Sequence, residues 1–468
     1  MFYSKHIEGM AGLIIEKINT TYTAFELFHA IQDEPYSFLL DSSMESEKLG
    51  RYTFMGCSPF LVFKSKNQNI TIEENNVIRS LIANPFDILK ELMEKYKAED
   101  RSNIPFLGGA VGYFAYDMCH NVEKLPRSAV DDVKIPDCCF GFYDSIIAID
   151  HYRKDTYIIS NGINEKPGNL VEELKSKLGN ITALSLENKQ GAACSEIQSN
   201  FSKEDYLKAV QRVKDYIRTG DIYQANLTQR FKCNTEESPF SIYSRLRRLN
   251  PAPFACYMNF GEGHILSSSP ERFLKIRENM IETRPIKGTR PRGRTAEEDK
   301  ANKAELLSSE KDKSELLMIV DLERNDLGKV SKTGTVKVPE LFYPEEYATV
   351  HHLVATVTGE MQDDINSIDV IKAAFPGGSI TGAPKIRAME IIDELEPTQR
   401  NIYTGSIGYL GFNGSIDLNI AIRTIVMKEG TAFFQAGGGI VWDSNPELEY
   451  EETLHKAKAL FRTLRNEL

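Results

Sequence analysis

The stretch FACYMNFGEGHILSSSPERFLKIRENMIETR, residues 254–284, decides the fold class. It holds four alternating apolar runs in succession, separated by only a few turn-forming residues: 254–260, 264–268, 272–277 and 280–284. Alternation with a period of two is typical of half-buried strands, and such short connections join antiparallel neighbours. This part of the chain therefore predicts an antiparallel sheet and not a series of βαβ units.

The rest of the chain has the same organisation, with strands in series and helices grouped between them. Helical periodicity occupies residues 24–32, 85–97, 203–219, 296–322, 367–374, 384–395 and 446–465. Further alternating runs occupy residues 36–40, 52–55, 145–150, 222–231, 405–412, 418–426 and 432–436. This arrangement favours an α+β fold with mostly antiparallel sheets.

A polar segment divides the chain into two regions. Residues 186–200 have neither the helical nor the strand period, so we expect them to form a linker. Residues 1–185 are then an N-terminal region and residues 201–468 a C-terminal region. Neither region contains an internal repeat or a low-complexity tract.

The chain of 468 residues is acidic, with 56 Lys and Arg against 67 Asp and Glu and a net charge of −11 at pH 7. This balance argues against binding to nucleic acids or to an anionic membrane, so an anionic substrate would need a local basic cluster. No segment approaches the roughly 18 consecutive apolar residues of a membrane span. The N-terminus lacks a signal-peptide pattern and the seven cysteines form no C-x-x-C pair, which predicts a cytoplasmic protein with reduced thiols and no zinc.

Two acidic pairs have the spacing of a shared helical face. Asp312 and Glu315 are three residues apart on one predicted helix, and Glu449 and Glu452 are three apart at the start of the last one. Four carboxylates brought together would repel one another unless a hard cation such as Mg²⁺ lay among them. The alternative is that each pair lies on a solvated face or, for the second pair, near a capped helix N-terminus.

Two glycine-rich strings could bind an anion through backbone N–H groups. Residues 376–385, PGGSITGAPK, open a helix, and residues 436–439, AGGG, follow a strand. Glycine allows the close approach of an anion, and a helix N-terminus adds partial positive charge. Tight turns without a ligand are the alternative.

A basic stretch, TRPIKGTRPRGR at 283–294, follows the hairpin of the opening sequence. If that hairpin turns at the two residues 278–279, residue 271 lies opposite residue 286. Glu271 would then come beside Lys287, which pairs an acid with an amine at one end of the hairpin. A structural ion pair and a solvated basic loop are the alternatives.

Taken together, eight motifs in this order resemble the chorismate-utilising family, which includes anthranilate synthase component I, aminodeoxychorismate synthase component I, and isochorismate and salicylate synthases. The motifs are SSSPERF (267–273), PIKGTRPRG (285–293), LLMIVDLERNDLGKV (316–330), HHLVATVTG (351–359), PGGSITGAPK (376–385), GSIGYLG (405–411), AIRTI (421–425) and QAGGGIVWDSNPELEYEET (435–453). The resemblance is dense over residues 200–466 and reaches the N-terminal region at FLLDSS, residues 38–43. It implies a sandwich of two central antiparallel sheets with outer helices.

The resemblance also implies a magnesium-dependent chorismate site. Glu315 and Glu452 match the family's Mg²⁺ ligands, and Asp312 and Glu449 match a second, water-mediated pair. Positions that match the substrate-binding set are Tyr403, Arg423, Gly437, Gly438 and Gly439, with His352, Thr381 and Lys385 lining the same pocket. The ring carboxylate of chorismate would lie on Mg²⁺, and Arg423 would hold the enolpyruvyl carboxylate with a bidentate fork.

Two positions distinguish members of the family. Gln224 stands where isochorismate and salicylate synthases carry a lysine that activates water, and an amide cannot take that proton. Lys287 stands where anthranilate synthases carry alanine and aminodeoxychorismate synthases typically carry lysine. The resemblance is therefore closest to aminodeoxychorismate synthase component I, with Lys287 as nucleophile and Glu271 as acid and base. Lys287 must be neutral to attack, and Arg284, Arg290 and Mg²⁺ nearby are expected to favour that form.

Such an enzyme converts chorismate and ammonia to 4-amino-4-deoxychorismate, the precursor of 4-aminobenzoate and folate. Because the chain lacks the Gly-x-Cys-x-Gly elbow of a glutaminase, a separate glutamine amidotransferase subunit is expected to supply the ammonia. Alternatives are anthranilate synthase component I, of tryptophan biosynthesis, and a non-catalytic subunit of an amidotransferase complex. In the family the N-terminal part can hold tryptophan, at positions that match Ser42, Arg51, Tyr52, Thr53, Pro253 and Phe254.

Overall fold

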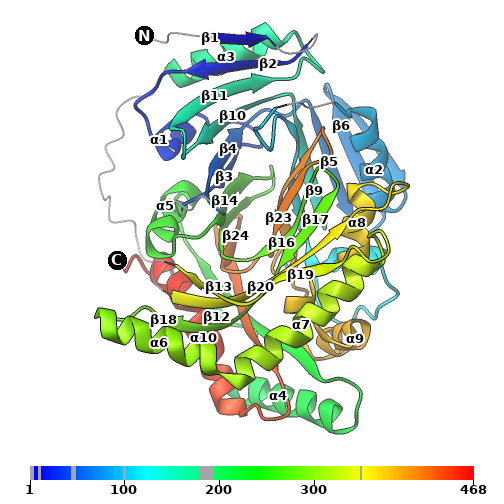
Figure 1. The fold of residues 1–468 in the computed structure, drawn as a ribbon, viewed down its shortest axis with the longest axis vertical. Helices are drawn as coiled ribbons and strands as arrows, with labels where there is room; N and C mark the ends of the chain where they lie inside the picture. The colour runs from blue at the N-terminus through cyan, green and yellow to red at the C-terminus, as the bar shows by residue number, and fades with distance from the viewer. Residues whose placement is uncertain are drawn as a thin grey trace.

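Two large antiparallel sheets face each other and organise the chain (Figure 1). The computed structural model describes residues 5–8, 12–43, 49–98, 102–179, 194–347 and 350–467. Aromatic and aliphatic side chains of both sheets pack between them; for example, the rings of Phe54 and Tyr409, from opposite sheets, lie 5.7 Å apart. This central layer is the common core of the molecule.

Each sheet combines strands from both halves of the sequence. The 13-stranded sheet has the order β1 (Lys5–Glu8), β2 (Ile14–Ile18), β11 (Asp155–Ser160), β10 (Ser145–Asp150), β4 (Tyr52–Gly56), β3 (Phe38–Asp41), β14 (Phe254–Asn259), β15 (His264–Ser269), β24 (Thr424–Lys428), β25 (Thr431–Ile440), β13 (Gln224–Asn234) and β12 (Gln198–Ser199), with β21 (Gly382–Ala383) also pairing with β13. The 12-stranded sheet has the order β18 (Ile286–Pro291), β20 (Val350–Glu360), β17 (Met280–Arg284), β16 (Arg272–Arg277), β23 (Ile416–Asn419), β22 (Ser406–Gly411), β8 (Gly109–Phe114), β9 (Cys138–Tyr143), β5 (Leu61–Lys66), β6 (Asn69–Glu74) and β7 (Val77–Ile82), with β19 (Lys337–Glu346) also pairing with β20.

Helices cover the outer faces of the two sheets. They are α1 (Ala24–His29), α2 (Pro85–Lys95), α3 (Pro167–Gly179), α4 (Lys203–Arg218), α5 (Pro239–Leu249), α6 (Ala296–Ser308), α7 (Glu310–Gly328), α8 (Ser367–Ala374), α9 (Lys385–Leu395) and α10 (Pro446–Leu464), with 3₁₀ turns at Tyr116–Asn121 and Gly378–Ile380. Helices α2, α7 and α8 pack on the 12-stranded sheet, and α1, α3, α5 and α10 pack on the 13-stranded sheet. None of these described helices is long and apolar enough to cross a membrane.

The predicted α+β sandwich of two antiparallel sheets is confirmed. Strand β3 pairs with β14 and strand β8 pairs with β22, so the N-terminal and C-terminal regions share both sheets. Within the expected linker at 186–200, residues 186–193 lie outside the described residues. Gln198–Ser199 form β12, which pairs with β13.

Three local predictions differ from the structure. The run at 418–426 is not one strand: β23 and β24 belong to different sheets, and the chain crosses between them through Arg423, whose φ is 51°. The helix predicted at 296–322 is two helices, because Ser309 ends α6 and its side chain caps α7. The glycines at 437–439 are not a turn but lie within β25.

Candidate active site

The hairpin of β16 and β17 brings Glu271 and Lys287 to one end of the 12-stranded sheet. Its two-residue turn is Glu278-Asn279, with φ of 50° and 64°, as a type I′ turn requires. The predicted pairing holds for the three pairs next to the turn and then shifts by one residue at a bulge. The register predicted for residue 271 is therefore wrong by one position, although the Ile286 N–H still donates to Glu271 Oε1 at 3.3 Å.

Glu271 and Lys287 both contact Ser379, which belongs to the first glycine-rich string, residues 376–385, called the glycine-rich turn below. Lys287 Nζ donates to the Ser379 carbonyl oxygen at 3.1 Å, and the Ser379 side chain hydrogen-bonds Glu271. Burial raises the pKa of Glu271, although Ser379 and Lys287 oppose this effect. The structure thus brings together the acid and the amine that the sequence paired.

Burial lowers the pKa of Lys287, and the positive charge of Lys456 lowers it further. Glu271, Glu315 and Glu452 act in the opposite direction. The net lowering increases the share of neutral amine, which is the nucleophilic form.

The two arginines expected to favour the neutral amine are engaged elsewhere. Arg284 forms ion pairs with Glu340 at 2.6 Å and with Glu345 at 2.5 Å. Arg290 pairs with Asp312 at 3.1 Å. Burial and the positive charge of Lys456 lower the pKa of Lys287, the effect that the sequence analysis expected from these arginines.

The two acidic pairs lie on α7 and α10: the pair near the start of α10 was predicted there, whereas Asp312 and Glu315 lie near a helix start because α7 begins at Glu310. A Cβ placed on Gly438 would lie 3.1 Å from Glu452 Oε1 and 3.2 Å from Glu449 Oε2, so both carboxylates reach the backbone of β25. Burial raises the pKa of Glu315, and the charges of Asp312 and Glu452 raise it further. The carboxylates of the two helices therefore act on one another across the site.

Two lysines offset part of this acidic charge. Lys456 Nζ lies 2.6 Å from Glu452 Oε1, and Lys311 Nζ lies 3.8 Å from Glu315 Oε1. Among the described residues, no three His, Cys, Asp or Glu side chains form a group that could hold a metal ion by themselves. Mg²⁺ is commonly held by one or two carboxylates together with water and substrate oxygens, so the oxygen donors of Glu315 and Glu452 fit this ion.

Two of the three glycines of β25 pack closely against β13. Gly437 lies opposite Thr228 and Gly439 opposite Asn226 on β13. A Cβ on Gly437 would lie 2.3 Å from a backbone oxygen of β13, and one on Gly439 would lie 2.1 Å from Gln224 Nε2. At Gly438 the bare backbone faces the carboxylates of Glu449 and Glu452, where a side chain would take up the space.

Arg423, Tyr403 and His352 form a neighbouring group. Burial lowers the pKa of Arg423 while Tyr403 opposes it, and burial together with the Arg423 charge lowers the pKa of His352 to about 4. Among the described residues no carboxylate pairs with the Arg423 guanidinium. Its left-handed backbone at the crossing between sheets is a strained conformation of the kind found at binding sites.

Thr381 and Lys385 make their contacts within the glycine-rich turn and α7. Thr381 Oγ1 donates to the carbonyl oxygens of Gly377 and Gly378 at 3.1 and 3.2 Å. Lys385 Nζ pairs with Asp326 and donates to the carbonyl oxygen of Pro376 at 2.9 Å. Both side chains therefore hold the turn in place.

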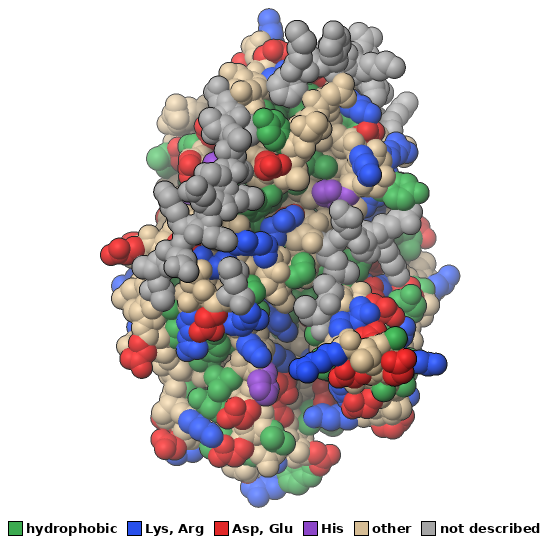
Figure 2. Space-filling view, turned by 90° about the vertical axis from the view of Figure 1, so that its left-hand side faces the viewer, with side chains coloured by type: hydrophobic (Ala, Val, Ile, Leu, Met, Phe, Trp, Pro, Cys, Tyr) green, Lys and Arg blue, Asp and Glu red, His purple; other side chains and the backbone are tan. Residues whose placement is uncertain are grey.

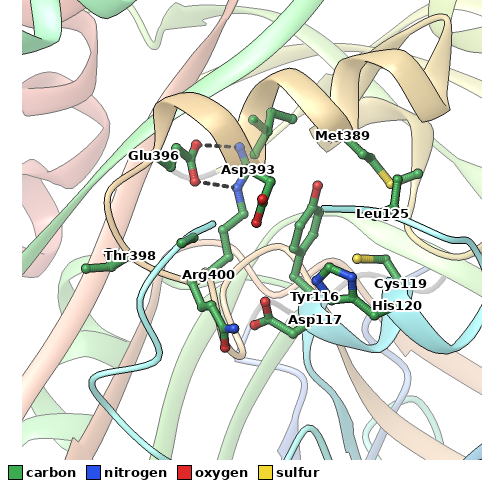
Figure 3. A pocket seen from close by; sticks show the side chains of 13 residues that line it. Tyr116, Asp117, Cys119, His120, Leu125, Met389, Asp393, Glu396, Thr398 and Arg400 are labelled. Carbon is green, nitrogen blue, oxygen red and sulfur yellow. Dashed lines mark hydrogen bonds and ion pairs between the residues drawn. The ribbon is translucent and has the colours of Figure 1, made fainter. Parts of the chain in front are cut away.

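A buried ion pair stabilises the contact between the glycine-rich turn and β13. Glu396 and Arg400 lie 2.7 Å apart on one side of a cavity of about 20 Å³, which has room for about one water molecule (Figure 3). Arg400 also donates to the carbonyl oxygens of Ile380, at 3.0 Å, and Asn226. It thereby ties the glycine-rich turn to β13, next to Tyr403.

A larger cavity, of about 250 Å³, lies beside strands of the N-terminal region. Five of the six positions that the resemblance associates with tryptophan line it: Ser42, Arg51, Tyr52, Pro253 and Phe254. Arg51 pairs with Asp150 at 2.7 Å, and Ser42 Oγ donates to the carbonyl oxygen of Tyr52 at 2.8 Å. The sixth, Thr53, is fully buried and its Oγ1 lies 2.8 Å from His151 Nε2.

The surface charge is unevenly distributed. Figure 2 shows Lys and Arg side chains gathered across the middle of one face, although the chain has a net charge of −11. This is the kind of local basic surface that an anionic substrate would require.

Sequence reasoning missed the roles of Lys456 and Ser379. Lys456 follows Glu452 by four residues, and this one-turn spacing on a helix could have revealed their ion pair. Ser379 stands within a quoted motif, but its contacts with Glu271 and Lys287 join segments about 100 residues apart and depend on the tertiary structure.

Comparison with known proteins defines the class. The sequence profile of the chorismate binding enzyme family matches residues 71–462, and the chain belongs to this family. It is a chorismate-utilising enzyme of the anthranilate synthase and aminodeoxychorismate synthase type.

Relatives of both types are similar over nearly the whole chain. Anthranilate synthase component 1 of Acetivibrio thermocellus is 44% identical over 459 residues, which cover 94% of this chain and 92% of the relative. Aminodeoxychorismate synthase component 1 of Escherichia coli (strain K12) is 39% identical over 440 residues, which cover 93% and 95%. The crystal structure of anthranilate synthase component I from Streptococcus pneumoniae TIGR4 superposes with a TM-score of 0.80 at 34% identity, covering 90% of this chain and 94% of that one.

Proposed function

We propose that the chain is component I of an aminodeoxychorismate synthase, which converts chorismate and ammonia to 4-amino-4-deoxychorismate, in the route to 4-aminobenzoate and folate. The observation that carries this proposal is the setting of Lys287, whose side chain is partly buried and whose Nζ lies 3.1 Å from the Ser379 carbonyl oxygen. A partly buried amine of lowered pKa beside a buried acid of raised pKa suits nucleophilic displacement.

The proposed reaction consists of two displacements. The neutral Lys287 amine forms a bond to C2 of the ring, the ring double bond shifts, and the C4–O bond breaks. Glu271 gives its proton to the departing hydroxyl, which leaves as water. Ammonia then forms a bond to C4, the double bond shifts back, and the C2–N bond to Lys287 breaks. The Glu271 carboxylate takes the proton that the new amine releases, so both side chains return to their starting forms.

Magnesium is the proposed cofactor, held by Glu315 and Glu452, with Asp312 and Glu449 acting through water. When bound, Mg²⁺ supplies positive charge for the ring carboxylate and for the charge that develops on the departing oxygen. Two observations support this fit. The four side chains offer oxygen ligands, and the carboxylates of Glu449 and Glu452 lie close to the bare backbone of Gly438.

The substrate carboxylate that does not contact magnesium is assigned to Arg423. Its guanidinium has no ion-pair partner among the described residues, so a bidentate pair with the enolpyruvyl carboxylate would satisfy it. Tyr403 and His352 would border this position, and the Gly437–Gly439 backbone would border the ring.

A glutamine amidotransferase subunit is the proposed partner, because this chain has no glutaminase nucleophile in a Gly-x-Cys-x-Gly elbow. The isolated chain is expected to use free ammonia. Glutamine would become a nitrogen donor only when the partner is present.

Anthranilate synthase component I is the second candidate. The observation that favours it is the relative of that name with 44% identity, against 39% for the aminodeoxychorismate synthase of Escherichia coli. Such an enzyme would aminate C2 and release pyruvate. The cavity of about 250 Å³ is a candidate tryptophan site under either assignment.

Mass spectrometry of the protein quenched with chorismate and Mg²⁺, without ammonia, tests the proposal. A peptide that contains Lys287 should carry the mass of the added ring, whereas the peptide that contains Lys275 serves as an internal control and should remain unmodified. Absence of the adduct on Lys287, in a preparation that consumes chorismate once ammonium is added, would rule out the two-step displacement.

A further inference from the structure

Glu323 is a buried carboxyl of α7 that no step of the proposed reaction uses. Its side chain is 3% exposed. Oε1 accepts a hydrogen bond from the Gly378 N–H at 3.1 Å, and Oε2 is buried without a hydrogen-bond partner among the described residues. Burying a carboxyl with one unsatisfied oxygen is costly, so its placement calls for a reason beyond packing.

The hydrogen-bond partner of Glu323, Gly378, directly precedes the residue that contacts both Lys287 and Glu271. Gly378 is followed by Ser379, whose carbonyl oxygen accepts from Lys287 Nζ at 3.1 Å and whose side chain hydrogen-bonds Glu271. A Cβ on Gly378 would lie 3.1 Å from Glu323 Oε1, so glycine allows the close approach of this carboxyl.

Other side chains hold the two ends of the glycine-rich turn. Lys385 Nζ donates to the carbonyl oxygens of Ala374 and Pro376 at 3.0 and 2.9 Å. Arg400 donates to the carbonyl oxygen of Ile380 at 3.0 Å, on the other side. Glu323 therefore acts on the middle of the turn, between these two anchors.

We propose that Glu323 is a positioning residue: its hydrogen bond to the Gly378 N–H fixes Ser379, and Ser379 sets the position of Lys287 relative to Glu271. The assignment to catalysis rests on the proposed function, whereas the control of the turn by Glu323 does not. Effective nucleophilic and acid catalysis requires the two groups to be held in a narrow range of positions.

Burial raises the pKa of Glu323 to about 7, with Asp326 adding to the increase and Lys385 opposing it. The neutral carboxyl is therefore abundant near neutral pH. Glutamine is a close mimic of that form, because it keeps the shape, the neutrality and an acceptor oxygen for Gly378. Leucine removes the acceptor and leaves the Gly378 N–H buried without a partner.

The experiment compares wild type, Glu323→Gln and Glu323→Leu by amide hydrogen exchange of residues 376–381 and by steady-state kinetics with chorismate, Mg²⁺ and ammonium. Glu323→Leu should speed exchange at Gly378 and lower kcat, each by about tenfold, with KM within about twofold. Glu323→Gln should restore both values to near those of wild type. The matched control is Leu327→Ala, one turn further along α7, which removes a fully buried side chain that donates and accepts no hydrogen bond.

Several outcomes would overturn the inference: unchanged exchange or kcat in Glu323→Leu, an equal loss in Glu323→Gln, or an equal loss of kcat in Leu327→Ala. If Glu323→Leu does not fold, Glu323→Asp, which withdraws the carboxyl by one methylene, must show the same fall in kcat and faster exchange. If wild type does not consume chorismate, the proposed function fails, and exchange at Gly378 alone decides whether Glu323 holds the turn.

Discussion

Replacing Gly438 by alanine tests whether Glu449 and Glu452 determine the affinity for magnesium. The added methyl group would lie 3.1 Å from Glu452 Oε1 and 3.2 Å from Glu449 Oε2, so these oxygens must move by a few tenths of an ångström. Mg²⁺ requires near-ideal octahedral geometry at about 2.0–2.1 Å, and displaced ligands or their partners cost about 10–100-fold in affinity. We expect the magnesium concentration for half-maximal activity to rise by about this factor.

The assay is a magnesium titration of chorismate consumption, together with thermal unfolding of each variant. Gly438→Ala should unfold near the wild-type temperature, because only side-chain ends must move. Gly437→Ala is the contrasting variant: its methyl group would lie 2.3 Å from the Leu227 carbonyl oxygen, so it should destabilise the fold. Gly328→Ala, with nothing within 4 Å of the new Cβ, should leave the magnesium dependence unchanged and should not destabilise the fold, because alanine is favoured over glycine in a helix. An unchanged magnesium dependence in a folded Gly438→Ala protein would refute the reasoning.

Three further predictions concern other parts of the molecule. Lys287→Ala should slow amination at C4 on the order of 100-fold or redirect ammonia to C2, as product analysis would show; a wild-type rate with the 4-amino product would contradict the assignment. Arg400→Met should lower the free energy of unfolding in urea by about 3–5 kcal/mol because Glu396 keeps a buried, unpaired charge, and the double variant with Glu396→Met should lose less; equal losses would argue against this pair. Burial raises the pKa of Asp117 to about 7, above its unfolded value, so the folded state binds the extra proton and this group's stabilisation falls as pH rises from about 4 to about 7. Asp117→Asn should therefore be more stable relative to wild type at pH 8 than at pH 5, and an equal difference at both values would contradict this assignment.

The fold class could be predicted because its signals are local. The runs at 272–277 and 280–284 match β16 and β17 residue for residue, and the run at 367–374 matches α8. Alternation fixes which side chains share a face of a strand, and the two-residue turn between β16 and β17 fixes their pairing. The bulge that shifts this pairing leaves no such signal, because it arises where β16 also pairs with β23.

The crossing at Arg423 shows the limit of periodicity most clearly. The alternating pattern continues through residues 418–426, yet β23 and β24 lie in different sheets. Both sheets bury their strands, so a change of sheet need not alter the pattern of apolar residues. The same limit applies to the glycines of β25, which the sequence placed in a turn because it cannot show the close approach of β13.

Parts of the candidate site followed from helical spacing and from the quoted motifs. The acidic pairs on α7 and α10 and the proximity of Glu271 to Lys287 were predicted from residue counts. The source of the lowered Lys287 pKa was not, because burial and the charge of Lys456 depend on how α10 packs against the sheets. Glu323 and Asp326 have the same three-residue spacing, but the sequence does not show that they are buried, because an acidic pair on a helix is usually solvated.

Product analysis of the wild-type protein with chorismate, Mg²⁺ and ammonium salt tests the central claim most directly. Because Lys287 would direct ammonia to C4 and the enolpyruvyl group would be retained, the account predicts 4-amino-4-deoxychorismate without release of pyruvate, identified by mass and by the absence of anthranilate fluorescence. Formation of anthranilate and an equal amount of pyruvate would contradict the account and assign the chain to anthranilate synthesis.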